Sequence, residues 1–534
     1  MKPSFVENRK KWICLLTLIM MLQLLAASYF CMQKQGFHYD EYYSYYSSNV
    51  TYGLAPTDRE WKDTEEIRSE FMVLPGQGFQ YGMVRQMQTY DVHPPLYYFL
   101  LHTVCSLFTG MFSKWFGLAL NLVFFIIAYW LFARISWEVF RGNRMLTAVS
   151  CLLFGFQPGV YSGITFIRMY MLLLVWCLAV MCWHIPFWKK EIRLTPGRGI
   201  SLLLLVAAGF LTHYYFAVFL FFLAAYTCLY EWLGRKNKKG SIAYGIAVCS
   251  GMGIAVLLYP ACLSHILRGY RGTEATDAFF ELSNTILRLD FFTELMNASV
   301  FGGAFWLLVI IFLCILLTRA FLERKNPEAK NRERLFLAQN QGLFCILTVT
   351  LGYFLVVAKT ALLNAQEANR YELPVYGFCL LLMMAGIYYG GKGLRGRGAK
   401  YAGGLLAAFV FFCQLFSLAQ GNVQFLYPED RKNVDWAKQN REAAVVYLYN
   451  PHNVWMIWDE AEELMQYERI YFVSLADSSA ITDEELLQEN KIYVYTSRMD
   501  EAEGIMDGLL QDNVKLKEKE KIRQLLYCDL YCLE

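Results

Sequence analysis

The sequence has few charged residues for its length, and this shortage limits what kind of protein it can encode. Aspartate, glutamate, lysine and arginine make up 18% of the 534 residues, whereas soluble domains average roughly 25%. The composition therefore excludes an ordinary cytosolic enzyme. A disordered chain is excluded too, because disorder needs low hydrophobicity and 56% of these residues are hydrophobic. What remains is an integral membrane protein.

Two further features are missing from the sequence. A secreted disulfide scaffold is excluded because all of the 15 cysteines except Cys528 and Cys532 lie in or beside apolar runs. Those two are four residues apart, which fits either a disulfide in an extracytoplasmic tail or two packed thiols on a helix. A net charge of +3 argues against nucleic-acid binding, since such proteins usually carry a basic patch or stripe.

The small net charge conceals two unlike parts. Residues 421–534 hold 23 acidic and 12 basic side chains, whereas residues 1–420 hold 37 basic and 23 acidic ones. The sequence therefore predicts an apolar, basic membrane domain over residues 1–420 and a soluble, acidic domain over residues 421–534.

The membrane domain contains eleven apolar runs of about the 20 residues that a helix needs to cross a bilayer. They lie near residues 12–32, 115–136, 145–165, 170–188, 198–214, 215–233, 241–263, 302–322, 342–364, 372–390 and 401–420. The first run follows Arg9, Lys10 and Lys11 and has no small-residue cleavage site, so it is expected to be retained rather than removed as a signal peptide. We predict a polytopic α-helical membrane protein with about 11–13 transmembrane helices.

The short basic loops predict the orientation of these helices. Basic loops favour the cytoplasmic side, and five of them fall there if each run crosses once: 134–144, 189–198, 235–239, 319–334 and 392–400. The loop 33–92 and the C-terminal domain are then extracytoplasmic, and a bacterial plasma membrane is the location that fits best. The apolar segment 93–110 either crosses the membrane or lies on its surface.

The C-terminal domain alternates strand and helix signals. Residues 443–449, 469–474 and 491–496 have the composition of buried strands, and residues 454–467 and 482–488 have helical periodicity between them. Strands separated by helices predict a small parallel sheet. Because no glycine-rich phosphate loop follows any of these strands, no nucleotide site is expected in this small α/β domain.

Four polar clusters are predicted near the extracytoplasmic face. The first is the adjacent carboxylates Asp40 and Glu41, which follow the first membrane helix among aromatic residues. A partly desolvated carboxylate has a raised pKa and can act as a general base. The alternative is an aromatic belt at the membrane interface with solvated acids.

The second and third clusters supply candidate anion-binding groups. His93 precedes two prolines at a helix start, where unpaired N–H groups favour an anion, although His93 or Asp91 could equally cap the helix. Arg168 and Tyr170 follow between two apolar runs, and a charge at membrane depth suggests a functional site unless it snorkels to the headgroups.

The fourth cluster is Arg370 and Tyr371 at the start of a later helix. Arginine presents a planar fork that suits bidentate contact with phosphate, and tyrosine adds a hydroxyl donor. Further donors on the same side are His213, His265, Arg268 and Arg271. A cavity lined by such groups, with two carboxylates, suits a phosphate-bearing substrate and a proton acceptor.

Taken in order, these motifs resemble those of GT-C-type glycosyltransferases, in the family-39-like group that includes protein O-mannosyltransferases and bacterial aminoarabinose transferases. The similarity lies in the acidic pair Asp40-Glu41, the D-x-H-P-P-L-Y-Y segment at 91–98, the R-x-Y at 168–170 and the R-Y-x-x-P at 370–374. Each motif is short, but the ordered set spans residues 36–374. The C-terminal domain matches no motif of the group.

The resemblance implies transfer of a sugar from a polyprenyl-phosphate donor to a lipid, glycan or protein acceptor on the extracytoplasmic side. Asp40 would match the catalytic base, with Glu41 as the alternative. His93, Arg370 and Tyr371 would face the donor phosphate. The sequence requires no cofactor, and no ligand spacing supports a divalent metal ion. Two other functions compete: an O-antigen-type polymerase or ligase, and a transporter or lipid flippase, which would more often show internal repeats.

Overall fold

The computed structural model describes residues 3–49, 57–323, 336, 339–392 and 397–534. Parts of the loop 33–92 and of the basic loops 319–334 and 392–400 lie outside the described residues. The chain forms two compact units. The membrane unit comprises Met1–Cys31, Gln88–Tyr97 and Gly117–Gln424, and the sheet unit comprises Met32–Met87, Tyr98–Phe116 and Phe425–Glu534.

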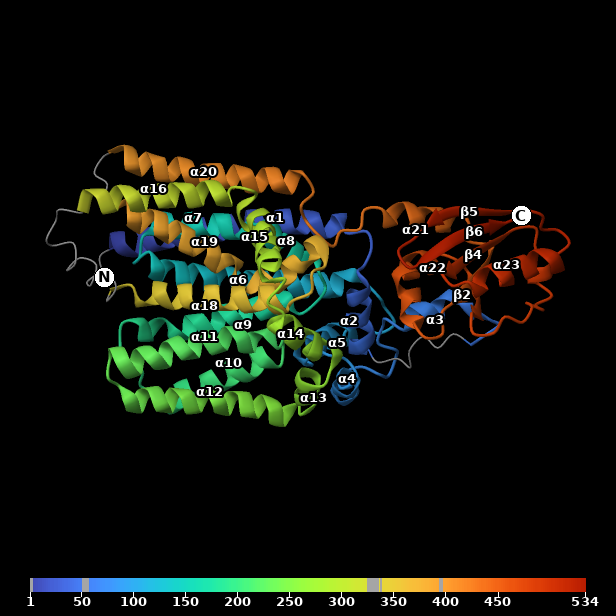
Figure 1. Cartoon of the computed structure of the whole chain (residues 1–534), viewed down its shortest axis with the longest axis horizontal. Helices are drawn as coiled ribbons and strands as arrows, with labels where there is room; N and C mark the ends of the chain where they lie inside the picture. The colour runs from blue at the N-terminus through green and yellow to red at the C-terminus, as the bar shows by residue number, and fades with distance from the viewer. Residues whose placement is uncertain (1–2, 50–56, 324–335, 337–338, 393–396) are drawn as a thin grey trace. The chain divides into compact units, whose positions relative to one another are not determined.

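Nine helices in the described residues are long and apolar enough to cross a membrane, so the protein is a multi-pass membrane protein. Figure 1 shows the long helices of the membrane unit running in roughly one direction. They are α1 (Pro3–Gln33), α6 (Lys114–Val139), α9 (Tyr170–His184), α11 (Tyr215–Leu229), α12 (Lys238–Leu258), α16 (Phe305–Glu323), α18 (Gln341–Thr360), α19 (Asn369–Gly391) and α20 (Arg397–Ala419).

The other two predicted runs are helical but differ from a plain span. The run 145–165 is divided into α7 (Arg144–Gly155) and α8 (Pro158–Thr165), which are bent by 51°. Pro158 stands at the start of α8, where its missing N–H ends the preceding helix and suits the first turn of the next. The run 198–214 contains α10 (Pro196–Phe210), which has 15 residues.

The segment 93–110 forms a short helix, α5 (Leu96–Ser106), of 11 residues. At 1.5 Å per residue it is about 16 Å long, half of the hydrocarbon core. Its length therefore favours the alternative in which this segment does not cross the membrane.

Three helices connect α12 to α16 within the membrane unit: α13 (Ala261–Leu267), α14 (Tyr270–Phe280) and α15 (Thr285–Phe301). Helix α15 ends at Gly302, whose left-handed φ of 59° is readily adopted by glycine. A 3-10 turn, η3 (Ala365–Ala368), leads into α19.

The sheet unit is built around a six-stranded sheet in the order β1-β3-β2-β4-β6-β5. The predicted strands are confirmed as β2 (Ala444–Tyr449), β3 (Arg469–Ser474) and β4 (Ile492–Ser497), and β2 pairs in parallel with both neighbours. The sequence did not predict three antiparallel strands: β1 (Glu60–Asp63), β5 (Lys519–Gln524) and β6 (Cys528–Leu533). Because β1 comes from the loop 33–92, the sheet is not made from the C-terminal residues alone.

Each face of the sheet is covered by different side chains, as the alternation of a strand requires. One face packs Val446, Val473 and Val494 against helix α23 (Glu501–Asp512). On the other face, the rings of Tyr447 and Tyr495 stack in parallel, 6.0 Å apart. The remaining helical elements are α2 (Tyr39–Asn49), α3 (Thr64–Ser69), α4 (Tyr81–Gln88), α21 (Asp430–Gln439), η4 (Val454–Glu460), α22 (Ala461–Leu464) and η5 (Leu486–Gln488).

Two expectations for the C-terminal domain were wrong. The helix expected over 482–488 is only the three-residue turn η5, which begins after Asp483 accepts a hydrogen bond from the Leu486 N–H and ends where Glu489 becomes extended. Cys528 and Cys532 are not on a helix. They are buried free thiols on strand β6, and their spacing of four places both on one side of the strand.

Candidate functional site

The predicted acidic pair lies at the start of helix α2 in the sheet unit, and its two members have different surroundings. The Glu41 side chain is fully buried and its Oε2 lies 2.8 Å from Lys34 Nζ. The same oxygen accepts a 2.6 Å hydrogen bond from the backbone N–H of His38. These contacts bind Glu41 into the turn that precedes α2, which is a structural position.

Asp40, by contrast, keeps part of its side chain accessible. Its carboxylate is 22% exposed, and Oδ2 lies 3.6 Å from Nδ1 of His38. That ring nitrogen also accepts a 3.0 Å hydrogen bond from the Asp40 backbone N–H, so it bears no proton in this arrangement. Of the two acids, Asp40 is the one that a substrate can reach.

Helix α2 packs its aromatic side chains against the C-terminal part of the sheet unit. The ring of Tyr39 lies 5.8 Å from that of Trp455, and Tyr43 and Tyr46 each lie 4.8 Å from Trp458. Such aromatic pairs stabilise beyond the apolar area that they bury. The C-terminal domain therefore holds the helix that carries Asp40.

A third acid, Asp430, lies beside the same turn and was not predicted from the sequence. A Cβ atom built on Gly36 would overlap Asp430 Oδ2, so the carboxylate occupies the space that a side chain at this position would need. Burial, together with the nearby charges of Glu429, Asp459 and Glu462, raises the pKa of Asp430 to about 7. Burial likewise raises the pKa of Glu462 to about 7.

The predicted anion-binding residues come together in the membrane unit. His93 Nδ1 lies 3.2 Å from Asp91 Oδ2, and Nη2 of Arg168 lies 3.4 Å from the same ring nitrogen. Burial alone would raise the pKa of Asp91, but His93 and Arg168 outweigh it and lower the value to about 2. Asp91 thus holds the ring of His93 through its Nδ1.

Arg370 is buried within a group of aromatic rings. Its guanidinium carbon lies 5.1 Å from the ring centres of Phe166 and Tyr371 and 6.0 Å from that of Tyr170. Nη2 also donates a 3.2 Å hydrogen bond to the Tyr371 hydroxyl. The rings fix the plane of the guanidinium group and leave its charge in a poorly hydrated place, where it attracts an anion strongly.

His213 completes this cluster. Its ring centre lies 6.0 Å from that of His93 and 5.4 Å from that of Tyr170. Burial holds its pKa well below the usual value, and the positive charges of His93, Arg168 and Arg370 lower it further. A neutral imidazole can still donate one hydrogen bond. We call these six residues the cationic cluster: His93, Arg168, Tyr170, His213, Arg370 and Tyr371.

The remaining donors lie at the edge of this cluster or outside it. Arg268 is exposed at the end of α13, and none of its described contacts reaches the cluster. Arg271 is half-buried; burial alone would lower the pKa of its guanidinium group, but Tyr270, Tyr371 and Glu274 outweigh it and raise the pKa. Nδ1 of His265 lies 2.8 Å from the Tyr214 hydroxyl, and Nε2 lies 3.3 Å from the Thr89 carbonyl oxygen.

The sequence reasoning also missed two buried ionisable residues. Lys34 is enclosed with Glu41 and donates to the Phe425 carbonyl oxygen at 2.7 Å. Glu372 is fully buried two residues after Arg370; a glutamate inside an apolar run was the available signal. Within the described residues, no group of three or more His, Cys, Asp or Glu side chains could hold a metal ion.

Comparison with known proteins places the fold. No protein-family model and no curated protein sequence matches the chain. Among solved structures, ArnT from Cupriavidus metallidurans bound to undecaprenyl phosphate matches with a TM-score of 0.51 at 10% identity, over 98% of both chains. The apo form of the same protein matches with a TM-score of 0.50 over the same shares.

A weaker match is the oligosaccharyltransferase of Archaeoglobus fulgidus, with a TM-score of 0.47 at 11% identity. It covers 90% of this chain and 68% of that one. ArnT is a glycosyltransferase of the GT-C type, and its match covers the membrane helices and the sheet-bearing part alike. The chain therefore has the GT-C-type membrane fold that its sequence motifs predict.

Proposed function

We propose that the protein is a membrane glycosyltransferase that moves a sugar from a polyprenyl-phosphate donor to an extracytoplasmic acceptor. The observation that carries this proposal is the cationic cluster: two arginines, two histidines and two tyrosines gathered from four separate segments of the membrane unit. Such a set suits a phosphate group held at the membrane. ArnT, which shares the fold, was crystallised with undecaprenyl phosphate, and this supports the same class of donor.

The cluster would act on the leaving group. As the bond between the anomeric carbon and the phosphate oxygen breaks, negative charge grows on the departing polyprenyl phosphate. Arg168 and Arg370 stabilise that charge in a site with little water, where a fixed cation is worth most. The Tyr371 hydroxyl holds Arg370 in place and offers a second donor.

Asp40 would act on the acceptor. Its carboxylate takes the proton from the acceptor hydroxyl while the oxygen attacks the anomeric carbon from the face opposite the phosphate. A new glycosidic bond forms, the polyprenyl phosphate leaves, and the anomeric configuration is inverted. Glu41 is the less suitable base, because Lys34 already occupies its buried carboxylate.

The test is transfer by the purified protein in proteoliposomes. A radiolabelled polyprenyl-phosphate sugar is supplied with an extract of envelope lipids and glycans, and labelled products are counted. We expect Asp40→Asn to lower transfer by about 10²–10⁴-fold, the usual contribution of a general base, while undecaprenyl phosphate still binds. Asp435→Asn is the matched control, since Asp435 lies on α21 and is 54% exposed. Near-normal transfer by Asp40→Asn would overturn the assignment of the base.

The same assay separates the competing functions. A flippase would move the labelled lipid between leaflets without consuming the sugar-phosphate bond, and it would not depend on Asp40. A polymerase or ligase would consume that bond and would differ in its product, which would be a lengthened or transferred glycan chain rather than a single added sugar.

A further inference from the structure

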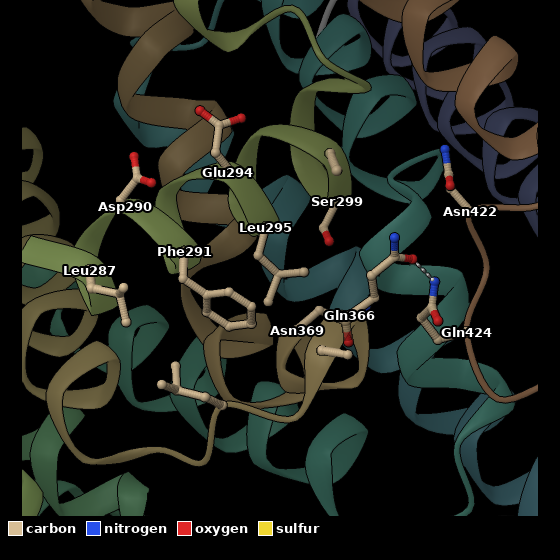
Figure 2. Close-up of a pocket in the computed structure, with 13 residues that line it drawn as sticks. Leu287, Asp290, Phe291, Glu294, Leu295, Ser299, Gln366, Asn369, Asn422 and Gln424 are labelled. Atoms are coloured by element: carbon tan, nitrogen blue, oxygen red, sulfur yellow. Dashed lines mark hydrogen bonds between the residues drawn. The ribbon is translucent and has the colours of Figure 1, made fainter. Parts of the chain in front are cut away.

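A pocket of about 570 Å³ lies in the membrane unit between helix α15, the turn η3 and the segment that follows α20. Its volume is within the range of about 300–1,000 Å³ that is typical of small-molecule sites. Figure 2 shows Phe291, Leu295 and Ser299 of α15 facing Gln366 and Asn369, with Asn422 and Gln424 beyond them. No residue of the cationic cluster lines it.

Seven of the thirteen residues that line the pocket are polar and six are apolar. Four side-chain amides line it, from Gln366, Asn369, Asn422 and Gln424, together with two carboxylates, from Asp290 and Glu294, and the hydroxyl of Ser299. No lysine, arginine or histidine is among the residues that line it. An amide offers both donors and acceptors, and a carboxylate offers acceptors only. The pocket therefore suits a ligand rich in hydroxyl groups and disfavours an anion.

Hydrogen bonds hold two of the polar residues that line the pocket, Gln366 and Gln424. Gln366 and Gln424 join their side chains by a 2.8 Å hydrogen bond. The backbone of Gln424 is held by α8, since its N–H donates to the Ser162 hydroxyl and its carbonyl oxygen accepts from the Thr165 hydroxyl. A site whose groups are ordered before binding loses less entropy when the ligand arrives.

Hydrogen bonds also hold the carboxylate of Glu294 in one orientation. Oε1 accepts a 2.7 Å hydrogen bond from the Trp306 indole N–H, and Oε2 accepts a 3.1 Å bond from the Asn297 amide. Each oxygen retains acceptor capacity after these bonds. Phe291 adds a flat apolar surface beside the polar groups.

We infer that this pocket binds a neutral carbohydrate unit and excludes acidic sugars. A pyranose has hydroxyl groups around its edge, which the amides and carboxylates can pair, and C–H groups on its faces, which can pack on Phe291. A uronic acid would bring a third negative charge beside Asp290 and Glu294. Rim and pocket charges of like sign act mainly by rejecting the wrong ligand.

This inference rests on the proposed function. The bound sugar would be part of the donor or part of the acceptor in the transfer reaction. Asn369 immediately precedes Arg370 on α19, so one helix end contributes a residue to the pocket and the next residue to the cationic cluster. The pocket would select the sugar while the cluster holds the phosphate.

The test measures binding without any transfer reaction. Saturation-transfer NMR on the purified protein in detergent would be recorded with glucose, galactose and N-acetylglucosamine, and with glucuronic acid as the anionic probe. We expect saturation transfer to at least one neutral sugar and none to glucuronic acid. Phe291→Ala and Gln366→Ala should each weaken the neutral signal by about tenfold, equivalent to 1.4 kcal/mol. Phe279→Ala on α14 is the matched control, since this exposed ring lies outside the pocket.

Three outcomes would overturn the inference: no neutral sugar bound, glucuronic acid bound equally well, or a neutral signal unchanged by both pocket variants. The source of the sugar follows from competition. Displacement by an undecaprenyl-phosphate sugar, but not by undecaprenyl phosphate, assigns the pocket to the donor. Persistence of the signal with saturating donor assigns it to the acceptor.

The two proposals can fail separately. Sugar binding by the wild-type protein without any transfer would overturn the proposed function and leave the pocket intact. Sugar transfer without sugar binding in this pocket would overturn the inference about the pocket and leave the proposed function intact.

Discussion

Lys34 Nζ lies 2.8 Å from Glu41 Oε2, and both side chains are fully buried. The pair is closed further by the Phe425 carbonyl oxygen, which accepts from Lys34, and by the His38 N–H, which donates to Glu41. Asp40 and Glu41 are adjacent in the sequence but therefore have different surroundings and different roles. Glu41 anchors the turn between α1 and α2, and this leaves Asp40 as the acid at the accessible surface.

The first prediction concerns Glu41→Gln. Removing one member of a buried ion pair leaves the other charge uncompensated, at a cost of about 3–5 kcal/mol. The thermal unfolding midpoint of the purified protein should fall clearly. The double variant Lys34→Met with Glu41→Gln should recover much of the loss, because no lone charge remains. Equal stability of the single and double variants would show that the pair is not coupled.

The second prediction concerns Arg370→Lys. Lysine keeps the charge but loses the planar fork that stacks on Phe166 and Tyr371. Charge-assisted hydrogen bonds contribute about 1.5–3 kcal/mol each, so the affinity for undecaprenyl phosphate should fall about 10- to 100-fold. Titration with the lipid in detergent measures it. Arg198→Lys on α10 is the control, and an unchanged affinity for Arg370→Lys would contradict the phosphate role.

The third prediction concerns Gly36→Ala. The new methyl group would overlap the Asp430 carboxylate, which must then rotate away or move together with the start of α21. Overpacking of this kind costs typically about 1–3 kcal/mol. The unfolding midpoint should fall, and Asp430→Gly in the Gly36→Ala background should restore it. An unchanged unfolding midpoint for Gly36→Ala would mean that the Asp430 side chain can move away without loss of stability.

The sequence predicted the membrane helices well because hydrophobic length is a local property. Each of the eleven apolar runs is helical in the described residues, and only the proline at 158 and the shortness of α10 alter the simple picture. The strands at 444–449, 469–474 and 492–497 were predictable for the same reason, since each is a continuous apolar run.

The missed strands had no such signal. β5 has mostly exposed residues at the edge of the sheet, and β1 is a four-residue polar segment that joins the sheet from far away in the chain. Contacts between distant residues were equally invisible. Nothing local to Gly36 indicates that Asp430 will lie against it.

Most residues of the cationic cluster were predicted because short motifs mark them, and the structure brings six of the nine suggested residues together. The exceptions were His265, Arg268 and Arg271, since charge and position on a predicted loop say nothing of where a side chain will point. The roles of these residues and of Asp40 remain predictions.

The last prediction concerns the pH dependence of stability. The pKa of Asp430 is raised to about 7 by burial and by Glu429, Asp459 and Glu462, whereas an unfolded aspartate titrates near about 3.9. Between these values the folded protein binds a proton that the unfolded chain has lost. Stability must therefore fall as the pH rises from about 4 to about 7, by at most about 1.4 kcal/mol per pH unit for this group.

Asp430→Asn should remove that contribution, so its unfolding midpoint should depend less on pH than that of the wild-type protein. The gain relative to wild type should be greater at about pH 8 than at about pH 5, because the unfavourable charge is fully present only above the folded pKa. Glu462 shifts in the same direction and would leave a residual slope. Asp435→Asn, on an exposed face of α21, should keep the wild-type profile. Parallel profiles for Asp430→Asn and wild type would show that this carboxyl group titrates near its usual value.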